Sequence, residues 1–170
     1  MGMGKSDESL RSTRLVFYKE DIEVIGKSLS VFLKNANAQC ALLVDKDGHL
    51  VTKEGESATF DLDTISALVA GSFAATKQMA KLLGEEEFAL MFHQGKKDNI
   101  QLSLVGERTI LAVIFDDRTT LGMVRLYSSQ VAAKLGQVFK DISERKKEGE
   151  KISQDFGQAA RGKLDDIFGN

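Results

Sequence analysis

The segment ISALVAGSFAATKQMAKLLG, Ile65 to Gly84, predicts a helix with no charged face over its first three turns. No charged residue lies between Asp63 and Lys77. A helix that is apolar on all sides has both faces covered. One face therefore belongs to this domain, and the other is expected to contact a partner. From the helical spacing of apolar residues, the core-facing stripe is predicted to be Ile65, Leu68, Ser72, Ala75, Met79 and Leu82.

The other elements are predicted from the spacing of apolar residues and from the turn residues between them. Helices are expected over 18–34, ending at Asn35 to Asn37, and from Thr119 or Thr120 through residue 142. Asp45-Lys46-Asp47-Gly48 predicts a hairpin turn of the Asp-Gly type, and Asp61 or Asp63 is expected to cap the central helix. The predicted strands are 39–44, 49–53, 87–93, 99–105 and 109–115.

The resulting order, α-β-β-α-β-β-β-α, predicts an α/β domain (an α+β sandwich) with a five-stranded, mostly antiparallel sheet and helices on its faces. Residues 109–115 are almost continuously apolar, which predicts a central strand covered on both sides. The domain is expected to span residues 15–143.

Composition limits the classes of function. A chain of 170 residues that is 42% hydrophobic and 28% charged is typical of one soluble domain. A net charge of −2 and scattered basic residues give no case for binding nucleic acid or an anionic membrane. No apolar run reaches the roughly 20 residues of a membrane span, and the N-terminus has no apolar signal region. We therefore expect a cytoplasmic protein. The single Cys40 excludes an internal disulfide and is expected to be a buried small hydrophobe.

The two ends differ from the middle. Residues 1–14 are polar and predict a disordered leader. Residues 144–153 are a charge run that predicts a linker or the end of the last helix, and residues 154–170 predict a short amphipathic segment. Two interpretations of this segment stay open: a tail that frays or packs on its own domain, or a docking segment that folds on binding. Its candidate docking residues are Phe156, Leu164, Ile167 and Phe168.

No motif predicts catalysis, a metal or a cofactor. Gly26-Lys27-Ser28 lacks the first glycine of a phosphate-binding loop and lies in a predicted helix. Asp155-Phe156-Gly157 matches a kinase motif, but the other kinase motifs are missing. His49 and His93 have no partner at a metal-ligand spacing. We therefore predict a protein that is not an enzyme in its own right.

Three segments carry a family resemblance: KNANAQCALLVDKDGHL at 34–50, LVAGSFAATKQMAKLLGEEEF at 68–88, and IFDDRTTLGMVRL at 114–126. Together with the element order they resemble the roadblock (dynein light chain roadblock) family, and within it the bacterial MglB type. The acidic-apolar ending LDDIF, residues 164–168, is similar to the end of those proteins. The resemblance implies a roadblock/longin-like fold.

The resemblance also implies a homodimer in which two sheets join edge to edge and the central helices lie side by side. Such dimers bind a Ras-like small GTPase of the MglA type and stimulate its GTP hydrolysis by favouring the competent GTPase conformation. These dimers act in cell polarity or motility. Whether the cytoplasmic protein is also concentrated at a cell pole stays open. The surface shared between self-contact and GTPase is then expected to include Ala67, Ala70, Gly71, Ala74 and Gln78.

Two further alternatives stay open. Roadblock domains also serve as non-catalytic scaffolds that bind a GTPase or a motility protein without changing hydrolysis. If an arginine is donated to the GTPase, Arg118 is the best candidate, although a loop arginine paired with the adjacent aspartates is the simpler interpretation. A small-molecule sensor of related fold is disfavoured, because no polar residues converge on an apolar pocket.

Overall fold

The structure is a computed structural model that describes residues 15–168, with the side chains of Ile167 and Phe168 outside the description. The predicted leader, residues 1–14, lies outside the described residues. Contacts divide the chain into two units, Tyr18–Val138 and a second unit that includes residues 15–17 and the chain from Phe139 onward. The elements are α2 (Lys19–Ala36), β1 (Cys40–Asp45), β2 (Leu50–Gly55), α3 (Leu62–Leu82), β3 (Leu90–Gln94), β4 (Asn99–Val105), β5 (Thr109–Phe115) and α4 (Leu121–Phe168).

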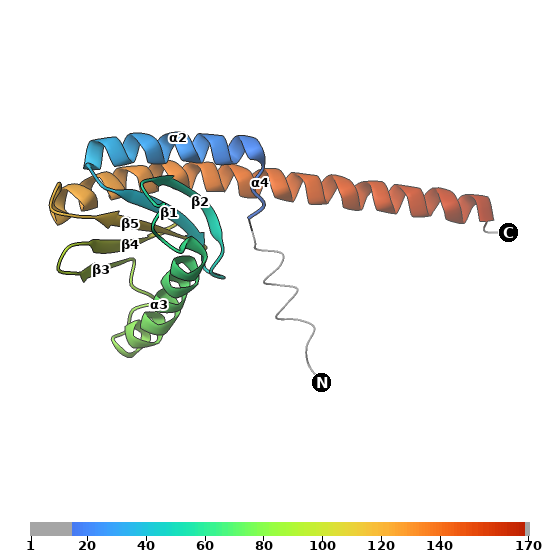
Figure 1. Ribbon diagram of the computed structural model, residues 1–170. Coiled ribbons are helices and arrows are strands. Elements are labelled where there is room, and N and C mark those ends of the chain that lie inside the picture. The colour runs from blue at the N-terminus through green and yellow to red at the C-terminus, as the bar shows by residue number, and fades with distance from the viewer. Residues whose placement is uncertain (1–14, 169–170) are drawn as a thin grey trace. The chain divides into compact units, whose positions relative to one another are not determined.

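This order confirms the predicted α-β-β-α-β-β-β-α arrangement, an α+β fold around one five-stranded sheet. The sheet order is β2-β1-β5-β4-β3, and every neighbouring pair is antiparallel. β5 is the central strand and all seven of its residues are buried, as its continuous apolar run predicts. In Figure 1, α3 covers one face of the sheet, and α2 with the first part of α4 covers the other.

Local signals fix the ends of the first two helices. Asn37 adopts the left-handed conformation (φ 51°) and ends α2, because a short polar side chain tolerates that conformation better than most residues do. The side chain of Asp61 accepts a hydrogen bond from the backbone N–H of Thr64 at 3.2 Å and caps α3. A terminal N–H of the helix is thereby satisfied.

The predicted core-facing stripe of α3 is wrong at most of its positions, although Ile65 does pack against the core. Leu68, Met79 and Leu82 are 65%, 56% and 87% exposed. The buried side of the helix carries instead Ser66, Val69, Ala70, Phe73 and Ala80. Val69 and Phe73 pack into the cluster formed by alternate residues of β1, β4 and β5. Because α3 has apolar residues on both sides, the 3.6-residue period fits either side and cannot select the one that meets the sheet.

The last helix is longer than predicted. Residues 144–153, where the charge run predicts a linker or a helix end, lie inside α4, and the helix continues through the predicted short segment to Phe168. The charged residues of the run are good helix formers, and the chain contains no proline. An ion pair between Lys146 and Glu150 (3.8 Å), one turn apart, also supports the helix.

Candidate functional site

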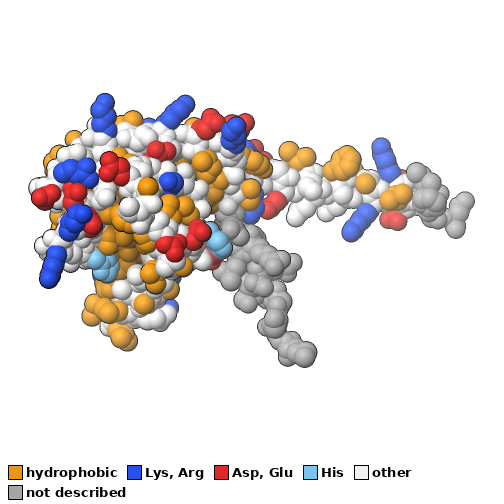
Figure 2. Space-filling view, in the orientation of Figure 1, with side chains coloured by type: hydrophobic (Ala, Val, Ile, Leu, Met, Phe, Trp, Pro, Cys, Tyr) orange, Lys and Arg blue, Asp and Glu red, His pale blue; other side chains and the backbone are white. Residues whose placement is uncertain are grey.

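The side of α3 turned away from the sheet carries small and apolar residues, and no charged residue lies between Asp63 and Lys77. We call this the α3 outer face and define it by Ala67, Leu68, Gly71, Ala74, Ala75, Gln78, Met79 and Leu82, all of which are exposed. Figure 2 shows hydrophobic side chains gathered at the lower end of the domain, where Figure 1 places α3. An exposed apolar surface of this kind is typical of a protein contact.

Four of the five predicted surface residues lie on the α3 outer face, and the fifth does not. Ala67, Gly71, Ala74 and Gln78 are exposed and follow one line along the helix. Ala70 is only 7% exposed. It is turned toward the hairpin turn between β1 and β2, which removes it from the surface that this helix presents.

The β1–β2 turn explains two of the small residues. Gly48 has a positive φ of 94°, and a Cβ placed on it would lie 3.2 Å from the Cα of Ala67 and 3.7 Å from the Cβ of Ala70. The backbone that approaches α3 closely at these two residues is therefore that of its own chain. The turn is held by Asp45, whose Oδ1 accepts hydrogen bonds from the backbone N–H groups of Asp47 and His49, each 3.0 Å long. Gly71 has no such internal reason to lack a side chain, because a Cβ placed on it would meet no atom within 4 Å outside its own stretch of helix.

Exposed leucines extend beyond the face that the sequence singles out. Leu82 and Leu83 at the end of α3 are 87% and 70% exposed, and Leu90 at the start of β3 is 39% exposed. Sequence reasoning assigned Leu82 to the core and did not consider Leu83 or Leu90. The sequence feature that could have marked Leu83 as exposed is its position directly before Gly84 (φ 82°), where the helix ends. A residue at a helix end often has no sheet beneath it.

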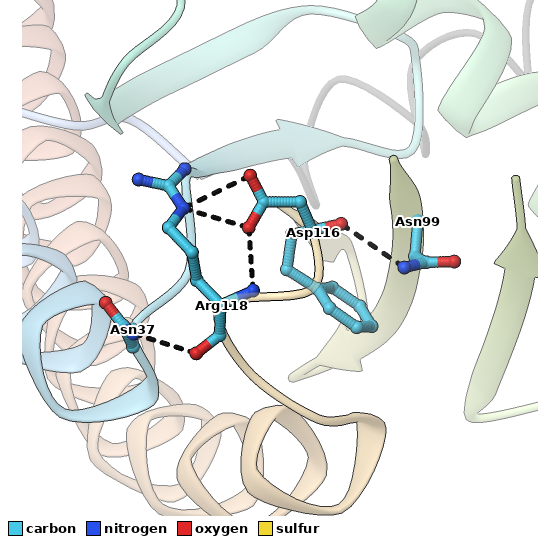
Figure 3. Close-up of polar contacts among 5 residues, drawn as sticks. Asn37, Asn99, Asp116 and Arg118 are labelled. Carbon is cyan, nitrogen blue, oxygen red and sulfur yellow. Dashed lines mark hydrogen bonds and ion pairs between the residues drawn. The ribbon is translucent and has the colours of Figure 1, made fainter. Parts of the chain in front are cut away.

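Arg118 lies in the turn between β5 and α4 and is held by an adjacent aspartate (Figure 3). Its Nε donates to Asp116 at 2.9 and 3.1 Å, and its backbone N–H donates to the same carboxylate at 3.1 Å. These hydrogen bonds raise the pKa of the Arg118 guanidinium and lower the pKa of Asp116. The side-chain amide of Asn37, at the end of α2, donates to the Arg118 carbonyl at 2.9 Å. Arg118 is thus fixed beside α2 and is not brought together with the α3 outer face.

The C-terminal part of α4 presents its apolar residues to solvent. Phe156 is 76% exposed and Leu164 is 52% exposed, and Ile152 (69%) adds a third apolar residue one turn before Phe156. The side chains of Ile167 and Phe168, the other two candidates, lie outside the described residues. This part of α4 also contains Gly149, Gly157 and Gly162, which lower helix stability, so helix stability does not explain why an exposed phenylalanine lies there.

Within residues 15–168, no group of three His, Cys, Asp or Glu side chains could hold a metal ion. Burial raises the pKa of the Cys40 thiol to about 11, so this cysteine is a poor nucleophile. In the same part of the chain, no helix is both long and apolar enough to cross a membrane.

Comparison with known proteins agrees with the fold. Residues 25–115 match the model of the Roadblock/LC7 domain. The structure of Myxococcus xanthus MglB is 40% identical, with a TM-score of 0.71, and the match covers 75% of this chain and 96% of that one. The gliding protein MglB of Thermus thermophilus is 32% identical over the same shares of the two chains, also with a TM-score of 0.71.

An uncharacterised protein of Aquifex aeolicus is 26% identical over 155 residues, which cover 89% of this chain and 91% of the relative. The match to the domain model includes all five strands and α3, and it extends over more than half of the chain. This chain therefore belongs to the Roadblock/LC7 domain family.

Proposed function

We propose that this protein is a homodimeric GTPase-activating regulator of a Ras-like small GTPase of the MglA type. The observation that carries the proposal is the similarity to MglB structures at 32–40% identity over 96% of their length. The uncharged α3 outer face supports it, because a contact surface on one subunit is expected to be apolar and exposed. A similar MglB has been solved in a tetrameric arrangement, which is consistent with self-association.

The proposed mechanism is selection of a GTPase conformation, without a catalytic residue supplied by this chain. Intrinsic hydrolysis by Ras-type GTPases is on the order of 10⁻⁴ per second. A partner that only selects a competent state cannot accelerate hydrolysis by more than the inverse of the resting population of that state. If that population is about 1%, the limit is about 100-fold, or roughly 2.7 kcal/mol.

The α3 outer face is the proposed platform for both self-contact and the GTPase. Gly71, Ala74 and Gln78 are its centre, with Ala67 at the boundary with the β1–β2 turn. Small side chains there would let the helix of a second subunit or a GTPase element approach closely. Arg118 plays no part in this proposal, since its Nε is already bonded to Asp116.

The test is a single-turnover GTP hydrolysis assay with the cognate GTPase, with and without this protein. We expect stimulation of about 100-fold or less. Binding of the GTP-bound GTPase with no change in its hydrolysis rate would contradict activation and leave the scaffold function. An absence of binding at high concentration would contradict both.

Removing Arg118 is expected to leave GTP hydrolysis within about threefold of the native rate, because a donated arginine contributes about 10³-fold or more and none is proposed here. Arg118→Ala is compared with Asp116→Ala, which breaks the same ion pair but keeps the guanidinium. Both are measured in single turnover at saturating regulator. A fall near 10³-fold in Arg118→Ala alone, with GTPase affinity unchanged, would contradict the conformational mechanism.

The C-terminal segment is proposed to dock on the GTPase through its apolar residues. Deleting residues 154–170 is expected to leave the fold and the homodimer unchanged and to weaken GTPase binding by about tenfold, the effect of losing one or two anchor side chains. A full-length Phe156→Ala, Leu164→Ala variant tests the same residues without shortening the helix. If GTPase affinity and nucleotide-exchange rate are both unchanged, the segment is a tail without a docking role.

A further inference from the structure

The α3–β3 loop, residues 83–89, is held to the domain at few points. Five of its seven residues are exposed, and only Glu87 and Phe88 are half-buried. Backbone hydrogen bonds hold its two ends: the N–H of Glu85 donates to α3 at 3.0 Å, and the carbonyl of Ala89 accepts from β4 at 2.9 Å. Between these ends, the position of the loop depends on the two half-buried side chains.

Glu87 is bound by Lys46, a residue of the β1–β2 turn that is distant in sequence. Lys46 Nζ donates to both carboxylate oxygens of Glu87, at 3.1 and 2.9 Å. The two side chains are only 25% and 23% exposed, and a partly buried ion pair is screened less by salt than one in open solvent. The neighbouring Glu86, in contrast, is exposed. The ion pair between Lys46 and Glu87 is therefore a specific tether for the loop.

The turn that carries Lys46 is itself fixed on two sides. The backbone N–H of Lys46 donates to the carbonyl of Arg108, in the turn between β4 and β5, at 2.9 Å. Arg108 Nη2 in turn donates to Asp47 Oδ2 at 3.2 Å. On the other side, Gly48 lies close to the backbone of Ala67 in α3. Because the backbone of the turn is already ordered, only the side chains of the ion pair lose conformational entropy when the tether forms.

The end of α3 needs such a tether because its last side chains are not packed. Ala80 is fully buried, but every residue from 81 to 86 is exposed, including Leu82 and Leu83. A helix end with few buried contacts opens at a low cost in free energy. The tether at Glu87 restrains the chain four residues after Leu83, and it therefore limits the opening of this last turn.

We infer that Lys46 is a positioning residue for the GTPase platform: its ion pair with Glu87 holds the α3–β3 loop and the exposed leucines at the end of α3. This inference rests on the proposed function, in which the α3 outer face, including Leu82, binds the GTPase. A surface that is ordered before binding loses less conformational entropy on binding, and its affinity is higher for that reason. Lys46 acts through Glu87 and not by touching the GTPase.

Amide hydrogen exchange in the free protein tests the tether. Lys46→Met removes the charge, and it is expected to speed exchange of the hydrogen-bonded amides of residues 83–85 about fivefold, the effect of losing one ion pair. Lys46→Arg keeps the ion pair and is expected to exchange as the native protein does. Glu87→Gln should resemble Lys46→Met, whereas the matched control Glu86→Gln changes the charge of an exposed neighbour and should have no effect. Unchanged exchange in Lys46→Met would overturn the tether and leave the proposed function intact.

Titration with the GTP-bound GTPase tests the positioning role. Lys46→Met is expected to weaken binding about fivefold but to leave the hydrolysis rate at saturating regulator unchanged, because the tether orders the free surface and makes no contact in the transition state. Lys46→Arg should bind with native affinity. Faster exchange with unchanged affinity in Lys46→Met would contradict the positioning role while the tether stands. If the native protein does not bind the GTPase, the positioning role fails together with the proposed function, and the exchange result still decides the tether.

Discussion

Ala74→Arg is expected to abolish binding of the GTP-bound GTPase while the domain stays folded. Ala74 is exposed at the centre of the α3 outer face, where a close approach is proposed. A long charged side chain there would lose its hydration without gaining a partner, which costs about 3 kcal/mol or more, a loss of about 150-fold or more in affinity. The substitution should not harm the helix itself, because arginine is a good helix former at an exposed position.

The measurement is titration calorimetry with the GTPase in its GTP-bound form. Ala133→Arg is the matched control, since Ala133 is an exposed alanine of α4, on the opposite side of the sheet from α3. Light scattering on both variants separates loss of GTPase binding from loss of the homodimer, because both contacts are proposed to use α3. If Ala74→Arg remains a dimer and binds the GTPase as the native protein does, the platform lies elsewhere.

The strands were the part of the fold most accessible from sequence. β4 and β5 begin and end at the predicted residues, 99–105 and 109–115. β4 has an alternating pattern and β5 is a continuous apolar run, with a turn at Gly106 between them. Together these features predict a hairpin in which β5 is a buried central strand. β3 was predicted three residues too early, at Glu87, because Phe88 and Ala89 are apolar but precede the first register pair at Leu90.

The candidate site was less accessible, because its surface depends on contacts distant in sequence. Periodicity places Ala67 and Ala70 on a small-residue face but cannot show that Gly48 packs against both of them. It also cannot decide which apolar side of α3 meets the sheet, and so Leu82 was assigned to the core although it is exposed. The ion-pair partner of Arg118 was easier to predict, since the aspartate that holds it is only two residues away in the sequence.

Gly55→Ala is expected to destabilise the domain by about 3 kcal/mol or more, a large part of the stability of a typical domain. Gly55 ends β2 with a φ of 92°, a conformation that side chains other than glycine rarely adopt. A Cβ there would collide with the carbonyl oxygen of Gln39 and would lie 2.9 Å from Leu33 Cδ1 and 3.0 Å from the Cα of Cys40. These atoms belong to α2 and to the start of β1, so the strain cannot be relieved without moving β2 away from both.

Urea unfolding at one fixed protein concentration measures the loss, because the stability of a dimer depends on concentration. Gly136→Ala is the matched control: the same methyl group is added in α4, away from the α3 outer face, where no atom outside its own stretch of helix lies within 4 Å. At a partly exposed helical position it should stabilise the domain by up to about 1 kcal/mol. The two variants are therefore expected to change the free energy of unfolding in opposite directions. Equal stability of both would mean that Gly55 neither holds its positive φ nor packs against Gln39 and Cys40 as described, because these two features distinguish it from the control glycine.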